Sequence, residues 1–442
     1  MSDEKKGLNV SVKSFLAAIA VIFALMVLTY GLTFVVPEGG IPFWKWALSP
    51  VLILGAEGNV SLIAVIIFLL VIGGVFNCLD KCGLMKYMLD KITYRFGKER
   101  YKMMAIVALF FMAMGSFIGS FEECVPLVPI VVALAIRLGW DALIGMGMSL
   151  LAAGCGFAAG VCNPFTIGVA QELAGLPMFS GMWFRCLVFI LIYILLADFL
   201  YHHVKRIEKP LDEKALGTAF EKKTSMDRAL ISFVGIMGVG ILVVLSSVFI
   251  PALQDYTMIV VALMFLSAGI VASLLTGLGL KGLGSTFVNG LTSILPAVLM
   301  ILMANSIKYT LTEAHILDTI LHSAVLAAGS LPRWVVMLFI YFIVLIMNFF
   351  IASGSAKAFL LIPLIMPLAQ LFEIPAQLCV VAFSFGDGFS NVFYPTNPVL
   401  LIGFGLADVS YVKWVKWSVK FQLANLILTS IVLLFGLWIG YC

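Results

Sequence analysis

The stretch Ser116-Phe-Ile-Gly-Ser-Phe-Glu-Glu-Cys-Val-Pro-Leu-Val-Pro129 places glycine, serine, glutamate and proline inside an otherwise apolar run. A second stretch, Phe350-Ile-Ala-Ser-Gly-Ser-Ala-Lys-Ala358, does the same in the other half of the chain, and Pro363 and Pro367 follow it. Paired interruptions at matching places in two halves are typical of the substrate site of a secondary transporter. These stretches therefore predict both the fold and the position of the site.

The composition excludes a soluble enzyme. Of the 442 residues, 62% are hydrophobic and only 11% are charged, whereas a soluble domain carries about 25% charged residues. Apolar runs of about 18 or more residues indicate transmembrane helices. We therefore expect an all-α polytopic membrane protein with about 11 transmembrane helices near 14–36, 61–77, 103–119, 141–160, 185–201, 228–250, 257–276, 285–304, 333–352, 377–391 and 417–440.

The basic residues predict which segments face the cytoplasm. Lysine and arginine gather in the N-terminal segment, in 79–102 and in 202–228. Cytoplasmic loops carry the excess of these residues, so we expect all three segments inside and the N-terminus in the cytoplasm. The segment 79–102 has the character of an amphipathic surface helix. The first apolar run is too long for a signal peptide and lacks a small-residue cleavage site, so we expect it to be retained.

Short matches between the two halves lie a nearly constant distance apart. Asn163 and Asn397 are 234 residues apart, as are Trp183 and Trp417. A constant offset predicts an internal repeat. One additional span precedes the second copy, so crossing parity reverses its orientation. The segment 306–331 carries a single basic residue, which agrees with an outer location and with inverted repeats.

The expected organisation has five parts. They are an N-terminal helix and outer loop (1–60), a first repeat (61–201) with a hairpin at 115–137, a cytoplasmic linker (202–227), scaffold helices (228–288) and a second repeat (289–442) with a hairpin at 350–372.

The two hairpin segments are interpreted as re-entrant helical hairpins. Pro126 and Pro129 cannot donate backbone hydrogen bonds, so they disfavour a continuous helix. Unwound backbone is tolerated at membrane depth only where protein or water satisfies its polar groups. The expected tips lie near Ser120–Glu123 and Ser353–Lys357. Two proline-kinked spanning helices are the alternative.

Each hairpin is followed by a helix that breaks at an Asn-Pro pair, at 163–166 and at 395–398. Unwound backbone frees carbonyl groups for a cation, and the following half-helix offers N-terminal amides to an anion. Capping of the broken helices is the alternative role of the polar side chains. The predicted substrate- or ion-binding residues are Ser120, Glu122, Glu123, Asn163, Thr166, Ser353, Ser355, Lys357, Asp387, Asn391, Thr396 and Asn397.

Three acids and one base belong to this set, namely Glu122, Glu123, Asp387 and Lys357. Each costs a few kcal/mol at the bilayer centre unless it is paired or in water. A salt bridge of Lys357 with a glutamate is one interpretation. The others are a proton-carrying carboxylate, a coupling-ion ligand and a counter-charge for an amine-bearing substrate. The candidate coupling ions are a proton, or sodium near Ser120, Asn163, Ser353 and Asn397.

Other polar residues are expected to have structural or interfacial roles. Arg185 lies near a predicted helix end, and His202 and His203 lie in a predicted charged loop. The eight cysteines show no paired metal-binding spacing. The positive charges sit in loops, so binding to nucleic acid is not expected.

Four runs resemble the YfcC family of bacterial carriers, which are candidate basic-amino-acid transporters that include arginine/ornithine exchangers. These runs are Phe121-Glu-Glu-Cys-Val-Pro126, Gly156-Phe-Ala-Ala-Gly-Val-Cys-Asn-Pro-Phe-Thr-Ile-Gly-Val-Ala-Gln171, Ala174-Gly-Leu-Pro177 and Phe383-Ser-Phe-Gly-Asp-Gly-Phe-Ser-Asn391. The family is related to anaerobic four-carbon dicarboxylate carriers within the ion transporter superfamily. The resemblance implies a homodimer in the bacterial inner membrane, with a scaffold, an elevator-type transport domain, and a site at 119–123, 353–357, 163–166 and 395–398.

Two positions depart from the family pattern. Lys357 stands where the family has glutamine, in a form similar to aminobenzoyl-glutamate carriers, and Asn397 stands where serine is commoner. An additional cation also suits a neutral amino acid or a carboxylate. The sequence thus predicts a secondary transporter for a small amino-acid-like substrate, a basic amino acid being favoured, by exchange or ion coupling. The alternatives are a sodium- or proton-coupled dicarboxylate carrier and a cation/proton antiporter. Motifs of intramembrane enzymes are missing from the sequence, so catalysis is not expected.

Overall fold

The computed structural model describes residues 12–34, 40–56, 60–96, 99–119, 121–177, 179–208, 223–246, 257–314, 316, 331–351 and 353–441. Within these ranges every regular element is a helix. Five helical segments of this described part are long and apolar enough to cross a membrane by length and composition, namely Arg100–Phe117, Ala142–Ala159, Met182–Ile207, Arg333–Phe350 and Tyr411–Trp438. Each of the eleven predicted spans coincides with helix over most of its described residues, while the number of crossings stays a prediction.

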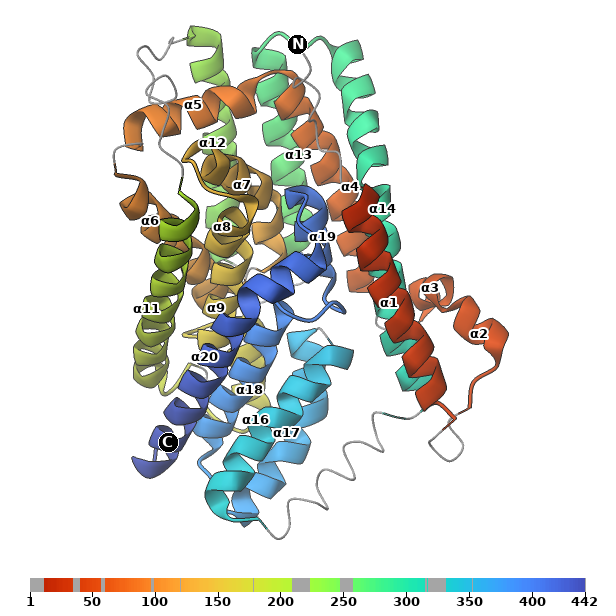
Figure 1. Ribbon diagram of the computed structural model, residues 1–442, viewed down its shortest axis with the longest axis vertical. Coiled ribbons are helices and arrows are strands. Elements are labelled where there is room, and N and C mark those ends of the chain that lie inside the picture. The colour runs from red at the N-terminus through yellow and green to blue at the C-terminus, as the bar shows by residue number, and fades with distance from the viewer. Residues whose placement is uncertain are drawn as a thin grey trace.

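One group of helices packs along a flank of the molecule. Helix α14 contacts α4 and α1, and α13 contacts α4 and α12. Figure 1 shows α1 and α14 side by side, with the short α2 and α3 beside the lower half of α1. The bounds are α1 (Val12–Leu32), α2 (Phe43–Ala47), α3 (Ser49–Leu52), α4 (Val60–Lys81), α12 (Thr224–Ser246), α13 (Thr257–Leu275) and α14 (Leu280–Glu313).

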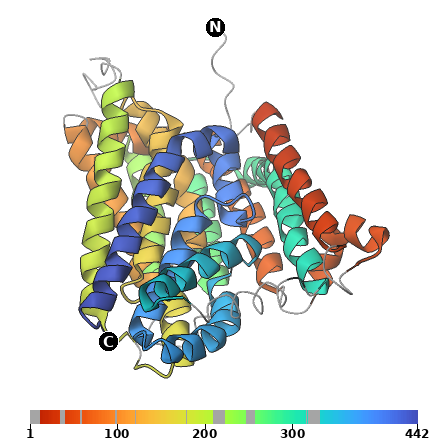
Figure 2. The ribbon, with the colours of Figure 1, turned by 60° about the horizontal axis from the view of Figure 1, so that its bottom comes forward.

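A second group surrounds the residues of interest. Here α9 lies against α18, α18 against α16 and α20, and α11 against α20 (Figure 2). The bounds are α6 (Arg100–Ala113), α7 (Val128–Arg137), α8 (Ala142–Met146), α9 (Ala152–Ala159), α10 (Val169–Leu173), α11 (Met182–Ile207), α16 (Arg333–Phe350), α17 (Gly354–Leu371), α18 (Ala376–Asn391), α19 (Pro398–Ala407) and α20 (Tyr411–Trp438). Short π-helical or 3-10 turns extend several of them, namely η3 (Met114–Ile118), η4 (Glu122–Leu127), η5 (Gly147–Leu151) and η6 (Pro164–Gly168).

The amphipathic helix α5 (Leu84–Phe96) links the two groups. Tyr87 donates to Oδ1 of Asp227 at 2.8 Å, and Lys91 lies 2.5 Å from the same oxygen at the start of α12. On the other side, Arg137 at the end of α7 lies 2.6 Å from Oδ1 of Asp90. Adjacent residues of α5 therefore hold one helix from each group.

Helices at matching places in the two halves pack against each other. This holds for α4 with α14, α9 with α18 and α11 with α20. Contacts between non-matching helices are also reciprocal. Helix α10 of the first half contacts α17 of the second, and their counterparts α19 and α7 contact each other. Such an arrangement brings both Asn-Pro breaks and both predicted hairpin segments into one region of the core.

Two glycines allow the close crossing of α9 and α18. A Cβ on Gly388 would overlap the backbone of Ala158, and a Cβ on Gly154 would overlap Cγ1 of Val392. The two contacts are reciprocal, since Gly154 with Gly388, and Ala158 with Val392, share the 234-residue offset. The pairing is antiparallel, so each helix breaks shortly after the crossing.

Several local expectations differ from the structure. Pro363 and Pro367 lie inside a continuous α17, so the chain is interrupted before them, between Phe350 and Gly354. Neighbouring groups in a membrane protein can satisfy the backbone that proline leaves unpaired. His202 and His203 lie in α11 and not in a loop, because that helix runs on to Ile207. The segment 306–331 begins within α14, and 315 and 317–330 lie outside the described residues.

Candidate functional site

The interruption in the second half positions Lys357. Helix α16 ends at Phe350, and Ile351 is extended. The hydroxyl of Ser353 then caps α17 by accepting a hydrogen bond from the amide of Ala356 at 3.4 Å. Lys357 is consequently on the first turn of α17, and its side chain has no exposed surface.

Lys357 forms a buried ion pair with Asp387 of α18. Its Nζ lies 2.7 Å from Oδ1 of Asp387, and the side chains of both residues are 0% exposed. The ammonium also donates to Oδ1 of Asn348 and, at 3.2 Å, to the carbonyl oxygen of Ile351. Lys357 is therefore in a salt bridge, but its acidic partner among the described side chains is Asp387; the side chains of Glu122 and Glu123 are not described. The partner is an aspartate of the same half, which the interruption of the chain brings opposite the lysine.

Asn348 is the centre of this network and was missed in the sequence. Its amide nitrogen donates to Oγ of Ser390 at 2.6 Å and to Oδ1 of Asn391 at 2.9 Å. Its amide oxygen accepts from Lys357. A single asparagine inside the apolar run of α16 is the feature that could have identified it, because a buried amide in a membrane helix needs polar partners.

The network continues to the break after α18. Asn391 donates to Oδ1 of Asp387 at 3.3 Å, and Asn397 donates to Oδ1 of Asn391 at 2.9 Å. The oxygen of Asn397 accepts from the amides of Val399 at 2.9 Å and Leu400 at 3.2 Å, which caps α19. Capping and participation in the cluster are thus combined in one side chain.

The break in the first half is held by Ser116. After α9 the chain turns at Gly160, whose φ is +48°. The hydroxyl of Ser116 then accepts from the amide of Val161 at 3.0 Å, and its carbonyl accepts from the amide of Cys162 at 3.2 Å. Asn163 follows and caps η6 by accepting from the amide of Thr166 at 3.3 Å.

Gly354 is where the two halves meet. A Cβ at this position would lie 2.6 Å from Oδ2 of Asp387 and 2.6 Å from Cγ2 of Thr166. Thr166 belongs to the first half, and both it and Asp387 are fully buried. The first-half residue Thr166 therefore borders the ion pair of the second half.

Several buried oxygens in this region have no hydrogen-bond partner within the described part of the chain. They are Oγ1 of Thr166, Oδ2 of Asp387 and Oγ1 of Thr396. Buried polar groups are nearly always paired, so unpaired oxygens around a buried ion pair are the features expected where a ligand or an ion binds.

Not every predicted residue can be placed. Among those described, the structure brings together Thr166, Lys357, Asp387, Asn391 and Asn397, whereas Ser353 is exposed and serves as a cap. Ser120 lies outside the described residues, and the side chains of Glu122, Glu123 and Ser355 are likewise not described.

Arg185 lies in the first turn of α11, near a helix end as expected, but its side chain is buried. It is 1% exposed. Its guanidinium donates to the carbonyl oxygens of Val161 at 3.1 Å, Ser180 at 2.9 Å and Phe179 at 3.3 Å. It ties the break after α9 to the loop before α11, because one planar group satisfies three unwound carbonyls.

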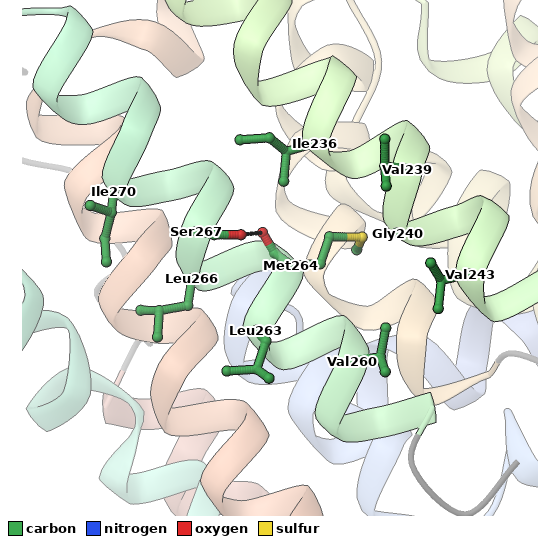
Figure 3. A pocket seen from close by; sticks show the side chains of 10 residues that line it. All are labelled: Ile236, Val239, Gly240, Val243, Val260, Leu263, Met264, Leu266, Ser267 and Ile270. Carbon is green, nitrogen blue, oxygen red and sulfur yellow. Dashed lines mark hydrogen bonds between the residues drawn. The ribbon is translucent and has the colours of Figure 1, made fainter. Parts of the chain in front are cut away.

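A cavity of about 500 Å³ lies elsewhere, between α12 and α13. Figure 3 shows apolar side chains around it, such as Ile236, Val243 and Leu263. Its polar lining residue, Ser267, donates to the carbonyl of Met264 at 3.0 Å. The cavity offers no charged group, so a polar substrate is better served by the cluster around Asp387.

Known proteins resemble the chain over most of its length. The profile of a family described as C4-dicarboxylate anaerobic carriers (DcuC) matches residues 48–437. A protein of Escherichia coli (strain K12), named as a candidate basic amino acid antiporter, YfcC, is 29% identical over 86% of this chain and 78% of its own length. An uncharacterized protein of Haemophilus influenzae (strain Rd) is 24% identical over 85% of this chain and 76% of its own length. Among solved structures, the YdaH transporter of Alcanivorax borkumensis covers 96% of this chain and 98% of its own, with 15% identity and a TM-score of 0.47.

Proposed function

The chain belongs to the DcuC family and is a multi-pass membrane transporter, and from this premise we propose that it carries a small amino-acid-like substrate, a basic amino acid being favoured. The transport site is the cluster around Asp387 and Lys357, together with the two Asn-Pro breaks. The observation that carries the proposal is the burial of this polar network, with unpaired oxygens from both halves, beside two helix breaks. Discontinuous helices at a repeat interface hold the substrate in many secondary transporters.

The hydrogen-bond donors of the described cluster are already occupied, which supports an amine-bearing substrate over a bare dicarboxylate. The N–H groups of Lys357 are all directed at protein oxygens. Two amides at the start of α19 are already capped by Asn397. A dianion would therefore need to displace existing partners. The runner-up is a sodium- or proton-coupled dicarboxylate carrier, which the description of the family favours.

We propose an elevator-type cycle for this transport. The helices α1, α4, α12, α13 and α14 pack among themselves and would form the scaffold. The group around α9 and α18 holds the polar cluster and would move, so that the site is exposed to each side in turn. The protein would act as a homodimer in the bacterial inner membrane. A cytoplasmic N-terminus agrees with the basic segments of the sequence.

Ligand-induced stabilisation of the purified protein tests the substrate class. Arginine, ornithine, neutral amino acids and four-carbon dicarboxylates are compared by the melting temperature, each with sodium and with choline. Only ligands that bind the native state raise the melting temperature. Stabilisation by arginine or ornithine, lost in Asn391→Ala, supports the proposal. Stabilisation by dicarboxylates alone would favour the runner-up.

A further inference from the structure

Three oxygen atoms surround the ammonium of Lys357. They are Oδ1 of Asn348, the carbonyl oxygen of Ile351 at 3.2 Å and Oδ1 of Asp387 at 2.7 Å. An ammonium has three N–H donors and accepts no hydrogen bond, so each donor has one oxygen. The lysine is 0% exposed, and its charge is neutralised inside the protein by Asp387.

The same oxygens form a set that suits a monovalent metal ion. Asp387 supplies a negatively charged carboxylate, and Asn348 supplies an amide oxygen. Ile351 supplies a backbone carbonyl from the extended residue that follows α16. Small hard cations take oxygen ligands of these kinds. Carbonyls freed at helix breaks coordinate the transported cation in several secondary transporters.

Two further oxygens extend this set. Oδ2 of Asp387 and Oγ1 of Thr166 are buried and have no hydrogen-bond partner within the described residues. Gly354 lies between these two side chains, and a Cβ there would fill the space beside Oδ2. The glycine therefore allows Thr166 and the carboxylate of Asp387 to pack closely against the start of α17.

We propose that the ammonium of Lys357 is a built-in counter-ion that occupies a monovalent-cation site between α16, α17 and α18, and that removal of the lysine side chain turns this site into one that binds sodium. The inference rests on the proposed function only in treating this cluster as part of the transport site. A tethered group has a high effective concentration, so the ammonium occupies the site at all salt concentrations. The second half of the chain consequently does not use sodium for coupling.

The predicted sodium site thereby divides into two parts. The part near Ser353 and Asn397 lies in the half that carries the ammonium, where Lys357 already supplies a positive charge beside Asp387. The part near Asn163 lies in the first half, and Ser120, the other residue of that part, is outside the described residues. The two halves would therefore differ in their cation: the second half carries the ammonium of Lys357, and the matching site of the first half has no lysine.

The test is the salt dependence of stability in Lys357→Ala. The melting temperature of the purified variant is measured in sodium, potassium and choline chloride at equal ionic strength. We expect sodium to raise it by roughly 2 °C or more over choline, since a bound ligand stabilises the native state. The wild-type protein is expected to show a smaller difference. Equal melting temperatures of the variant in sodium and choline would overturn the proposal.

Two control variants define the origin of any sodium effect. In Lys357→Met an uncharged chain of similar length fills the cage, and in Lys357→Ala/Asp387→Asn the carboxylate is lost. Neither should gain stability from sodium, and a gain in either one contradicts the proposal. If Lys357→Ala folds in sodium but in neither potassium nor choline, the proposal is supported. If Lys357→Ala folds in no salt while Lys357→Ala/Asp387→Asn does fold, the proposal is contradicted. All of these measurements concern stability and none concerns transport. The sodium proposal can therefore be supported or contradicted whether or not the proposed substrate class is correct.

Discussion

The ammonium of Lys357 lies 2.7 Å from Oδ1 of Asp387, and neither side chain has any surface exposed to solvent. Both residues belong to the second half of the chain, yet Thr166 of the first half borders their contact through Gly354. This chain therefore has an internal salt bridge at the place where its two halves meet. The predictions below follow from this placement and from the packing around it.

Asp387→Asn should lower the stability of the protein. The change leaves the buried ammonium without its counter-charge, and breaking a buried pair costs about 3–5 kcal/mol. Lys357→Met/Asp387→Asn removes both charges and should recover a large part of this loss. The measurement is the melting temperature of the wild type, both single variants and the double variant. Additive losses in the double variant would contradict an energetic coupling between the two residues.

Gly388→Ala should be more harmful than its small size suggests. The new Cβ would overlap the backbone of Ala158, which cannot move away as a flexible side chain can. Overpacking of this kind costs about 1–3 kcal/mol. The matched control is Gly235→Ala in α12, where no atom lies within 4 Å of the added Cβ. A helical Gly→Ala change in open space should be neutral or stabilising by up to about 1 kcal/mol. Equal melting temperatures of the two variants would refute the close crossing.

Arg185→Lys should destabilise the protein although the charge is kept. Lysine cannot reproduce the planar fork that reaches the carbonyls of Val161 and Ser180. Unpaired buried carbonyls cost roughly 1–3 kcal/mol each. Thermal melting with and without substrate separates two roles. A lower melting temperature and weaker substrate stabilisation are expected, because the break before Asn163 loses its support. Unchanged values in both assays would show that the arginine is dispensable.

The contact between Asp90 and Arg137 should influence the rate of transport more than stability. The two side chains are 36% and 34% exposed, and pairs of this kind are worth about 0–1 kcal/mol. If α7 moves relative to α5 in the cycle, Arg137→Asp should change the uptake rate. The swap Asp90→Arg/Arg137→Asp should restore it. A swap that behaves like the single variant would argue against a role for this pair.

The sequence indicated where the chain is interrupted but not how the polar residues pair. Proline, glycine and Asn-Pro pairs act locally, so the breaks near 119, 163, 351 and 397 could be located without a structure. Asn348 and Arg185 were not recognised. A single asparagine in an apolar helix, and an arginine near a helix end, have the same local pattern whether they face lipid headgroups or the core. The partner of Lys357 depends on how α17 packs against α18, which the order of residues does not encode locally.

The helix contacts agree with the inverted repeats that the sequence predicts. The reciprocal contacts of α10 with α17 and of α19 with α7 place each Asn-Pro half-helix against the predicted hairpin of the other half. A substrate between them would contact both halves at once. The side chains of Glu122 and Glu123 are not described, so their place in this site remains a prediction from the sequence.

Counterflow in proteoliposomes tests the central proposal most directly. Vesicles loaded with unlabelled arginine are diluted into labelled arginine, in choline buffer and in sodium buffer, with Lys357→Met/Asp387→Asn as the control variant. The proposed function predicts transient accumulation of label that needs internal arginine and is lost in the variant. Uptake no greater than in protein-free vesicles, with four-carbon dicarboxylates exchanging instead, would contradict it.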